Sequence, residues 1–195
     1  MHKTFSIELP AWLPVWLEQR GDDLATDEAR MSFVIELARQ NVRAGTGGPF
    51  AAAVFEPENH RLIAMGVNLV TASGLSLAHA EMVALSLAQQ HFGDWDLARH
   101  GELMLVTSCE PCAMCFGAVP WSGVRSMVCG ARKEDAEAAG FDEGHKPDDW
   151  ASSLRERGIE VSEGVLREEA TEVFDFYRAQ GGVIYNPGGD VESSS

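Results

Sequence analysis

The sequence predicts an α/β fold, a three-layer α/β/α sandwich with a central mixed sheet. Strand-like apolar runs alternate with segments whose apolar residues recur at helical spacing. The first two strand-like runs are joined by a short polar connection, which is typical of an antiparallel hairpin. The later runs are separated by helical segments, as parallel crossovers require. These observations together favour a sheet of both kinds with helices packed against it.

The first predicted elements are a helix and a hairpin. Between a cap at Thr26 or Asp27 and a stop at Gly45, apolar residues recur with the period of an amphipathic helix. Two short apolar runs follow at 50–55 and 62–67, and the polar residues between them favour a turn. We therefore expect two antiparallel strands directly after this helix.

The rest of the chain alternates between helix and strand. One helix is expected to begin at His79 or just before it, and another at Cys112, because a proline precedes that residue. In full, the remaining pattern predicts helices at 78–90, 112–121, 133–139, 148–157 and 166–179, and strands at 103–107, 124–129 and 159–161.

The chain divides into an arm, one domain and a tail. Residues 1–25 form an N-terminal arm in which Pro10 and Pro14 interrupt an apolar pattern, so one long helix is not expected there. Residues 26–185 hold the periodic segments and have the length of a single well-buried domain. Residues 186–195 are acidic and rich in Gly and Ser, which predicts a disordered tail.

Composition narrows the function classes. Acidic residues outnumber basic ones 30 to 15, for a net charge of −15, so nucleic acid is an unlikely partner on electrostatic grounds. The longest apolar runs are far too short to span a membrane. Three of the four cysteines are crowded into 109–115, which is too cramped for a disulfide framework and favours metal binding in a reducing compartment. We expect a cytoplasmic protein without membrane contact.

Two short motifs place metal ligands at the starts of two predicted helices. His79 offers an imidazole, and Cys112 and Cys115 offer two thiols about one helical turn apart. Three such ligands leave a fourth position open for water, as a catalytic zinc requires. We therefore expect one zinc ion per chain. Glu81 follows His79 closely enough to exchange protons with that water without binding the metal.

Cys109 leaves a second ligand set open. Its spacing to Cys112 repeats the spacing from Cys112 to Cys115, so it can replace either of these or add a ligand. A closed zinc site or a pair of buried core cysteines is the corresponding structural interpretation. We favour the pair that follows the proline, and we expect Cys129, inside an apolar strand, to fill the core.

A His-x-Glu motif followed by Pro-Cys-x-x-Cys is the signature of zinc-dependent nucleobase deaminases. At these residues the chain resembles the cytidine deaminase superfamily, and within it the bacterial guanine deaminases more than the tRNA adenosine deaminases. The resemblance implies a homodimer that deaminates a free nucleobase, guanine to xanthine and ammonia. Its landmarks are Gly48-Pro49-Phe50, Gly66-Val67-Asn68, His79-Ala80-Glu81, the segment 111–118, Trp121 and Ala139-Gly140-Phe141-Asp142.

The resemblance also implies roles for individual residues. Asn68 is expected to hydrogen-bond the purine, since its amide donates and accepts at once. Phe50 and Trp121 can stack on a flat heterocycle, although aromatic residues are often simply core. Ala80, between His79 and Glu81, is also expected to contact the substrate. Tyr185 is placed like a terminal aromatic residue that, in some relatives, reaches a partner's active site.

The expected proton carriers are three carboxylates. Glu81 would take a proton from the attacking water and return protons to the ring nitrogen and to the leaving ammonia. Either Asp142 or Glu143, which follow the Ala-Gly-Phe run, can help to protonate the departing amine, and the sequence does not separate them. The alternative for this pair is a solvated acidic loop.

Three alternative functions stay open. A tRNA adenosine deaminase shares both motifs but needs a cationic surface, which the acidic composition does not favour. Triazine, pterin or cytosine-like amines are further substrates, because the shape of the pocket selects among them. A zinc-stabilised binding module is the non-enzymatic alternative. Glu81 argues against it, since a structural zinc does not need that residue.

Overall fold

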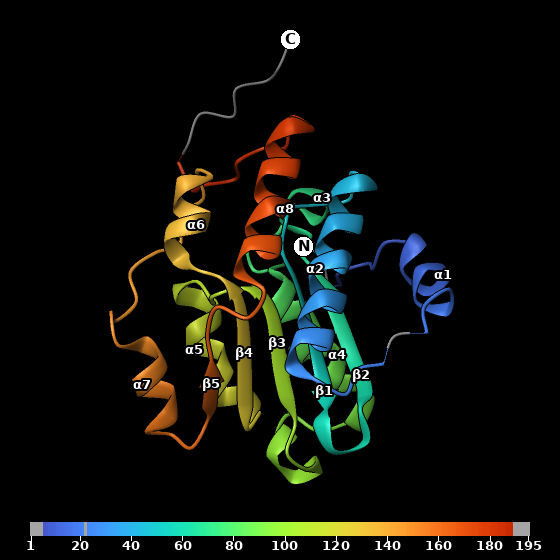
Figure 1. The fold of residues 1–195 in the computed structure, drawn as a ribbon, viewed down its shortest axis with the longest axis vertical. Coiled ribbons are helices and arrows are strands. Elements are labelled where there is room, and N and C mark those ends of the chain that lie inside the picture. Colours follow the sequence, from blue (N-terminus) through green and yellow to red (C-terminus); the bar gives the residue numbers. More distant parts are fainter. Residues whose placement is uncertain (1–5, 22, 189–195) are drawn as a thin grey trace, which may run out of the picture.

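The computed structural model describes residues 6–21 and 23–188, which form the mixed sheet that the sequence predicts (Figure 1). The strand order is β2-β1-β3-β4-β5. β1 pairs antiparallel with both β2 and β3, whereas β3, β4 and β5 are parallel. The hairpin and the later crossovers are therefore confirmed. The strands are β1 (Ala51–Glu56), β2 (Arg61–Val67), β3 (Met104–Cys109), β4 (Ser126–Ala131) and β5 (Glu160–Ser162).

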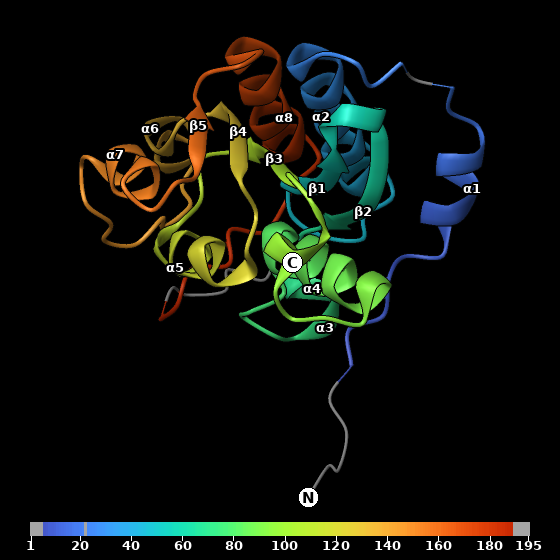
Figure 2. The same cartoon turned by 90° about the horizontal axis from the view of Figure 1, so that it is seen from below.

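Helices cover both faces of the sheet, which confirms the three-layer architecture. α2 (Asp27–Arg43) and α8 (Arg167–Ala179) lie on one face, and α4 (Ala80–Phe92) and α5 (Ala113–Ser122) lie on the other (Figure 2). The shorter elements are α1 (Trp12–Glu18), α3 (Val70–Ser73), α6 (Lys133–Ala138), α7 (Trp150–Arg155) and the 3₁₀ turns η1 (Pro57–Asn59) and η2 (Leu97–His100).

The alternating side chains of the strands divide the core into two halves. Along β1, Ala53 and Phe55 belong to the cluster under α2 and α8, and Ala52 and Val54 belong to the cluster under α4 and α5. All four side chains are fully buried. Burial on both faces is typical of a central strand and explains why this segment is continuously apolar.

The helix that begins after His79 packs closely against the edge strand of the hairpin. A Cβ atom on Gly66 of β2 would lie 2.4 Å from the carbonyl oxygen of Ala80, so only glycine permits this approach. The helix starts at Ala80 with His79 as its N-cap residue, one residue later than the predicted start at His79. The close packing fixes the N-terminal end of α4 relative to the sheet.

The two ends of the described chain also pack on the domain. Within the arm, Trp12–Glu18 forms one short helix, and Leu13 is 5% exposed and joins the core under α2 and α8. Pro14 lies in the first turn, where its missing N–H breaks no intrahelical bond. Asn186, with which the predicted tail begins, hydrogen-bonds the backbone of Gly140 and Asp142. The other predicted tail residues from 189 onward lie outside the described residues.

No helix within residues 6–21 and 23–188 is long and apolar enough to cross a membrane.

Candidate active site

Two helix N-termini bring together the three predicted metal ligands. His79 and Cys112 are the N-cap residues of α4 and α5, and Cys115 lies in the first turn of α5. These two helices pack side by side on one face of the sheet (Figure 2). The Nδ1 atom of His79 lies 3.5 Å from the Sγ atom of Cys112 and 3.7 Å from that of Cys115. The three ligand atoms all lie within 4.8 Å of one another.

The donor set fits zinc in both chemistry and spacing. In a tetrahedral site with Zn–N of about 2.0 Å and Zn–S of about 2.3 Å, a nitrogen and a sulfur ligand are separated by about 3.5 Å. The two observed separations, 3.5 and 3.7 Å, agree with this value. Cys109 instead donates its S–H to the carbonyl of Arg132 and does not join the cluster. The structure thus favours the pair that follows Pro111.

The thiol groups of the two cysteines in the triad differ in pKa. A hydrogen bond from the Cys115 thiol, aided by one from His79, lowers the pKa of Cys112 to about 4 despite burial. The same bond to Cys112, together with burial, raises the pKa of Cys115 well above its usual value. The lowered pKa of Cys112 favours its thiolate form, which is the form that binds zinc.

Glu81 is a buried carboxylate in the first turn of α4. It is 8% exposed, and burial, reinforced by the negative charge of Cys112, raises its pKa to about 7. The positive charge of His79 opposes this shift. A carboxyl group with a pKa near neutrality both accepts and releases protons readily, which suits a proton carrier.

The two candidate acids on the loop after α6 have different surroundings. Glu143 is 6% exposed, and burial, with the charges of Cys112 and Glu81, raises its pKa to about 8. Its carbonyl accepts a hydrogen bond from the N–H of Ala113 (2.9 Å), which ties the loop to the start of α5. Asp142 is exposed, and its carboxylate accepts the N–H of Gly144 (2.9 Å) in a local turn.

A pocket of about 310 Å³ opens beside the triad, a volume at the small end of the range for ligand sites. Predicted residues on its wall include Phe50, Asn68 and Tyr185. The Tyr185 hydroxyl is buried at this pocket and has no hydrogen-bond partner among the described residues. Buried hydroxyl groups are normally paired, so this atom is available to a ligand. The full lining is Phe50, Asn68, Val70, Ser76, His79, Glu81, Glu110, Cys112, Ala113, Met114, Phe141, Asp142, Glu143, Gly144, Tyr185, Asn186 and Pro187.

Two predicted substrate-binding residues are not on this wall. Trp121 is 81% exposed, because α5 directs Cys115 and Val119 into the core and Trp121 away from it. The expectation that Trp121 stacks on the substrate is therefore not met within one chain. Ala80 is fully buried in the core cluster under α4 and α5 and does not line the pocket.

The sequence interpretation missed several lining residues. Asn186 and Pro187 line the pocket, yet they fall in the segment predicted as a disordered tail. The Asn-Pro pair after Tyr185 is a turn signal that could have marked them. Met114 and Ser76 carry no comparable signal, because their place on the wall depends on how α5 and the loop after α3 pack.

The structure combines a mixed sheet with two helix N-termini that present one His and two Cys ligands, and a buried glutamate lies two residues beyond the His. This combination defines the class of zinc-dependent deaminases. Comparison with known sequences agrees. The sequence model of the cytidine and deoxycytidylate deaminase zinc-binding region matches residues 24–131. The chain belongs to this family of zinc-dependent deaminases.

Among its relatives is the guanine deaminase of Bacillus subtilis (strain 168), 36% identical over 141 residues, which cover 72% of this chain and 87% of the relative. The solved guanine deaminase from Nitrosomonas europaea is 50% identical, with a TM-score of 0.85 over 92% of this chain and 98% of that chain. Another similar structure, a complex with 2,6-diaminopurine, is 52% identical, with a TM-score of 0.87 over 95% and 98% of the two chains.

Proposed function

We propose that this chain catalyses the hydrolytic deamination of guanine to xanthine and ammonia. The observation that carries the proposal is the pocket, in which the buried carboxyl groups of Glu81 and Glu143 accompany the His79–Cys112–Cys115 triad. Relatives named guanine deaminase support the choice of substrate, as does a similar structure solved with 8-azaguanine.

The proton steps follow from the positions of the two glutamates. Glu81 takes a proton from the attacking water at its carboxylate and passes it to the ring nitrogen next to C2. The water oxygen forms the new bond to C2, the bond from C2 to the exocyclic amine breaks, and the amine leaves as ammonia. Glu143, protonated near neutral pH because of its burial, donates a proton to that amine. It recovers a proton when the hydroxyl group left on C2 loses its own and becomes the carbonyl of xanthine. A zinc ion bound to the triad supplies Lewis acidity toward the water.

Substrate binding is assigned to three residues of the wall. The Oδ1 atom of Asn68 accepts the N–H of Val70 (3.2 Å), which orients the amide and leaves its Nδ2 group for a purine acceptor. The buried Tyr185 hydroxyl, unpaired within the described residues, supports a second hydrogen bond to the base. Phe50, half-buried and packed against Phe141, offers an apolar surface for the ring.

We also propose that the protein is a homodimer, with α5 at the interface, and that it is located in the cytoplasm. α5 carries no charged residue, yet Met114 is 39% and Trp121 81% exposed. An exposed apolar surface of this kind is typical of an interface, and a second copy of the chain is its proposed occupant. The four cysteines, all within the described residues, form no disulfide bonds, which favours a reducing compartment.

Turnover of a substrate panel tests the proposed function. Purified zinc-loaded protein is incubated with guanine, adenine, cytosine, a pterin, a triazine and a tRNA anticodon arm, and ammonia release is followed with and without a chelator. We expect release from guanine, with xanthine as the second product, and its loss on chelation. Release from another compound but not from guanine would overturn the substrate. No release from any compound would favour the zinc-stabilised binding module.

A further inference from the structure

A buried amide near the C-terminal end of α2 joins two segments of the pocket wall. Asn41 is 0% exposed, and its Nδ2 group donates to the carbonyl oxygens of Gly48 (2.9 Å) and Asn68 (3.0 Å). Its Oδ1 atom accepts the hydroxyl of Thr46 (2.7 Å). Because an unpaired polar group in the core is costly, these bonds hold α2, the loop before β1 and the segment after β2 in one arrangement.

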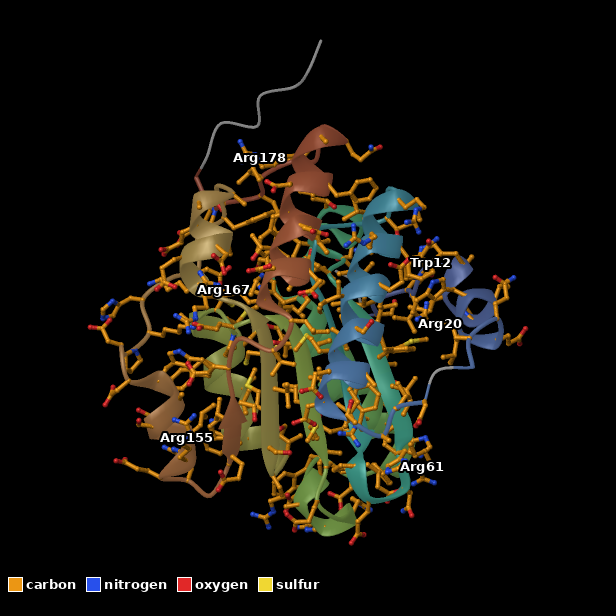
Figure 3. The ribbon with its side chains drawn as sticks, in the orientation of Figure 1. Trp12, Arg20, Arg61, Arg155, Arg167 and Arg178 are labelled. Atoms are coloured by element: carbon orange, nitrogen blue, oxygen red, sulfur yellow. The ribbon has the colours of Figure 1, made fainter. Side chains whose placement is uncertain are left out.

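The hydroxyl of Thr46 extends this arrangement to the N-terminal arm. The Nε1–H group of Trp12 donates to Thr46 Oγ1 (3.0 Å), and the same hydroxyl donates to Asn41. A hydroxyl can accept and donate at once, so the connection is continuous. Trp12 lies where α1 faces α2 (Figure 3). A hydrogen-bond chain therefore runs from Trp12 through Thr46 and Asn41 to the carbonyl of Asn68.

The hydrogen-bond chain ends at Asn68, whose side chain lines the pocket. The N–H of Asn68 donates to the carbonyl of Phe50 (2.9 Å), and its own carbonyl accepts from Asn41. The loop before β1 presses on the same carbonyl, since a Cβ atom on Gly47 would lie 1.8 Å from it. The backbone of Asn68 is thus held from the side of α2, while its amide lines the pocket.

We propose that Thr46 and Asn41 are positioning residues for the substrate, and that the N-terminal arm takes part through Trp12 by holding the Thr46 hydroxyl. The hydrogen-bond chain sets the position of the Asn68 backbone and hence the direction of its amide. This inference rests on the proposed function, because it is there that Asn68 is assigned to the purine.

Kinetics distinguish this role from general support of the fold. The Asn68 amide binds the base in the ground state and in the transition state alike, so its misplacement raises KM and leaves kcat nearly unchanged. A variant that only weakens the fold lowers the fraction of active protein, which reduces kcat per total protein and leaves KM unchanged. The decisive readout is therefore KM and kcat measured separately, because kcat/KM falls in both cases.

The central experiment compares two substitutions at Thr46 in the full-length zinc-loaded protein. Thr46→Val keeps the shape of the side chain but removes the hydroxyl, and Thr46→Ser keeps the hydroxyl. We expect Thr46→Val to raise KM for guanine about threefold to tenfold, the effect of one lost hydrogen bond, and Thr46→Ser to retain the wild-type KM. Equilibrium binding of 8-azaguanine should weaken in parallel.

The arm is tested with a matched pair of tryptophan variants. Trp12→Phe removes the donor to Thr46, whereas Trp16→Phe removes an indole of the same helix that packs against Trp12 and Phe33. We expect a higher KM only for Trp12→Phe, with similar melting temperatures for the two variants.

The proposed function, the hydrogen-bond chain and the role of the arm are each contradicted by a different result. If the wild-type protein forms no xanthine from guanine, the proposed function is overturned. Wild-type turnover with equal KM values for Thr46→Val and Thr46→Ser would overturn the hydrogen-bond chain alone. Equal KM values for the two tryptophan variants would remove the arm from it.

Discussion

Replacement of Lys146 by methionine would break a buried ion pair that borders the zinc-binding loop. The Nζ group of Lys146 lies 3.0 Å from a carboxylate oxygen of Glu110 and donates to the carbonyl of Pro111 (2.9 Å). The two side chains are 3% and 8% exposed. The ammonium group also lies 4.5 Å from the ring centroid of Trp150. The variant therefore leaves a carboxylate in the core without its counter-ion.

The size of the effect follows from this burial. Removing one partner of a buried pair typically costs about 3–5 kcal/mol, which is a large part of the roughly 5–15 kcal/mol that stabilises a domain. In the double variant Lys146→Met, Glu110→Met, the uncompensated charge is gone, and the unpaired carbonyl of Pro111 accounts for a residual cost of about 1–3 kcal/mol. We expect the double variant to be more stable than the single one.

Urea unfolding of the zinc-loaded protein at a fixed free zinc concentration, followed by circular dichroism, measures these differences. Lys133→Met is the matched control: this lysine is 27% exposed and pairs with Glu137 at 3.4 Å, so its loss should cost no more than about 0.5 kcal/mol. A loss below about 1 kcal/mol for Lys146→Met, or a double variant no more stable than the single one, would refute the reasoning.

Four further predictions use other parts of the molecule. Glu81→Gln should keep bound zinc but lose about a thousandfold or more in turnover, which metal analysis and ammonia release measure together; near wild-type turnover would remove Glu81 from the proton steps. A hydrogen bond from Arg167 lowers the pKa of Asp135, so the folded carboxyl has the lower pKa. The resulting stability is present above the unfolded pKa and lost as pH falls through the folded pKa; urea midpoints from about pH 6 to about pH 3 should show less acid sensitivity in Asp135→Asn. Zinc removal by a chelator should lower the melting temperature, because ligands that bind only the folded state stabilise it, and an unchanged temperature would contradict the metal's place at the two helix ends. Trp121→Glu should shift sedimentation from dimer to monomer, and an unchanged mass would count against α5 as the interface.

The zinc triad could be predicted from the sequence because its determinants are local. The spacing of Cys112 and Cys115 places both sulfurs on one turn of a helix, and His79 stands directly before another helical pattern. By contrast, α5 is apolar on all sides, so its sequence contains no contrast that would show Trp121 to be on the outer face.

Asn41 is a polar residue on the buried face of an amphipathic helix, and the sequence alone shows this position. It continues the apolar series of Met31, Val34 and Ala38 along the buried face of α2, where an amide is unexpected. A polar residue on such a face needs hydrogen-bond partners, and these come from residues 46, 48 and 68. The pattern indicates that partners exist, but only the fold identifies them.

The sequence by itself determined the order of the main helices and strands, the mixed sheet and the candidate zinc ligands, because periodicity and short spacings act between neighbours in the chain. The tertiary structure decided which of Asp142 and Glu143 is buried, and it brought Asn68 and Tyr185 to one wall. Both outcomes depend on packing between segments far apart in sequence. Adjacent carboxylates such as 142 and 143 are equivalent until the surrounding core excludes water from one of them.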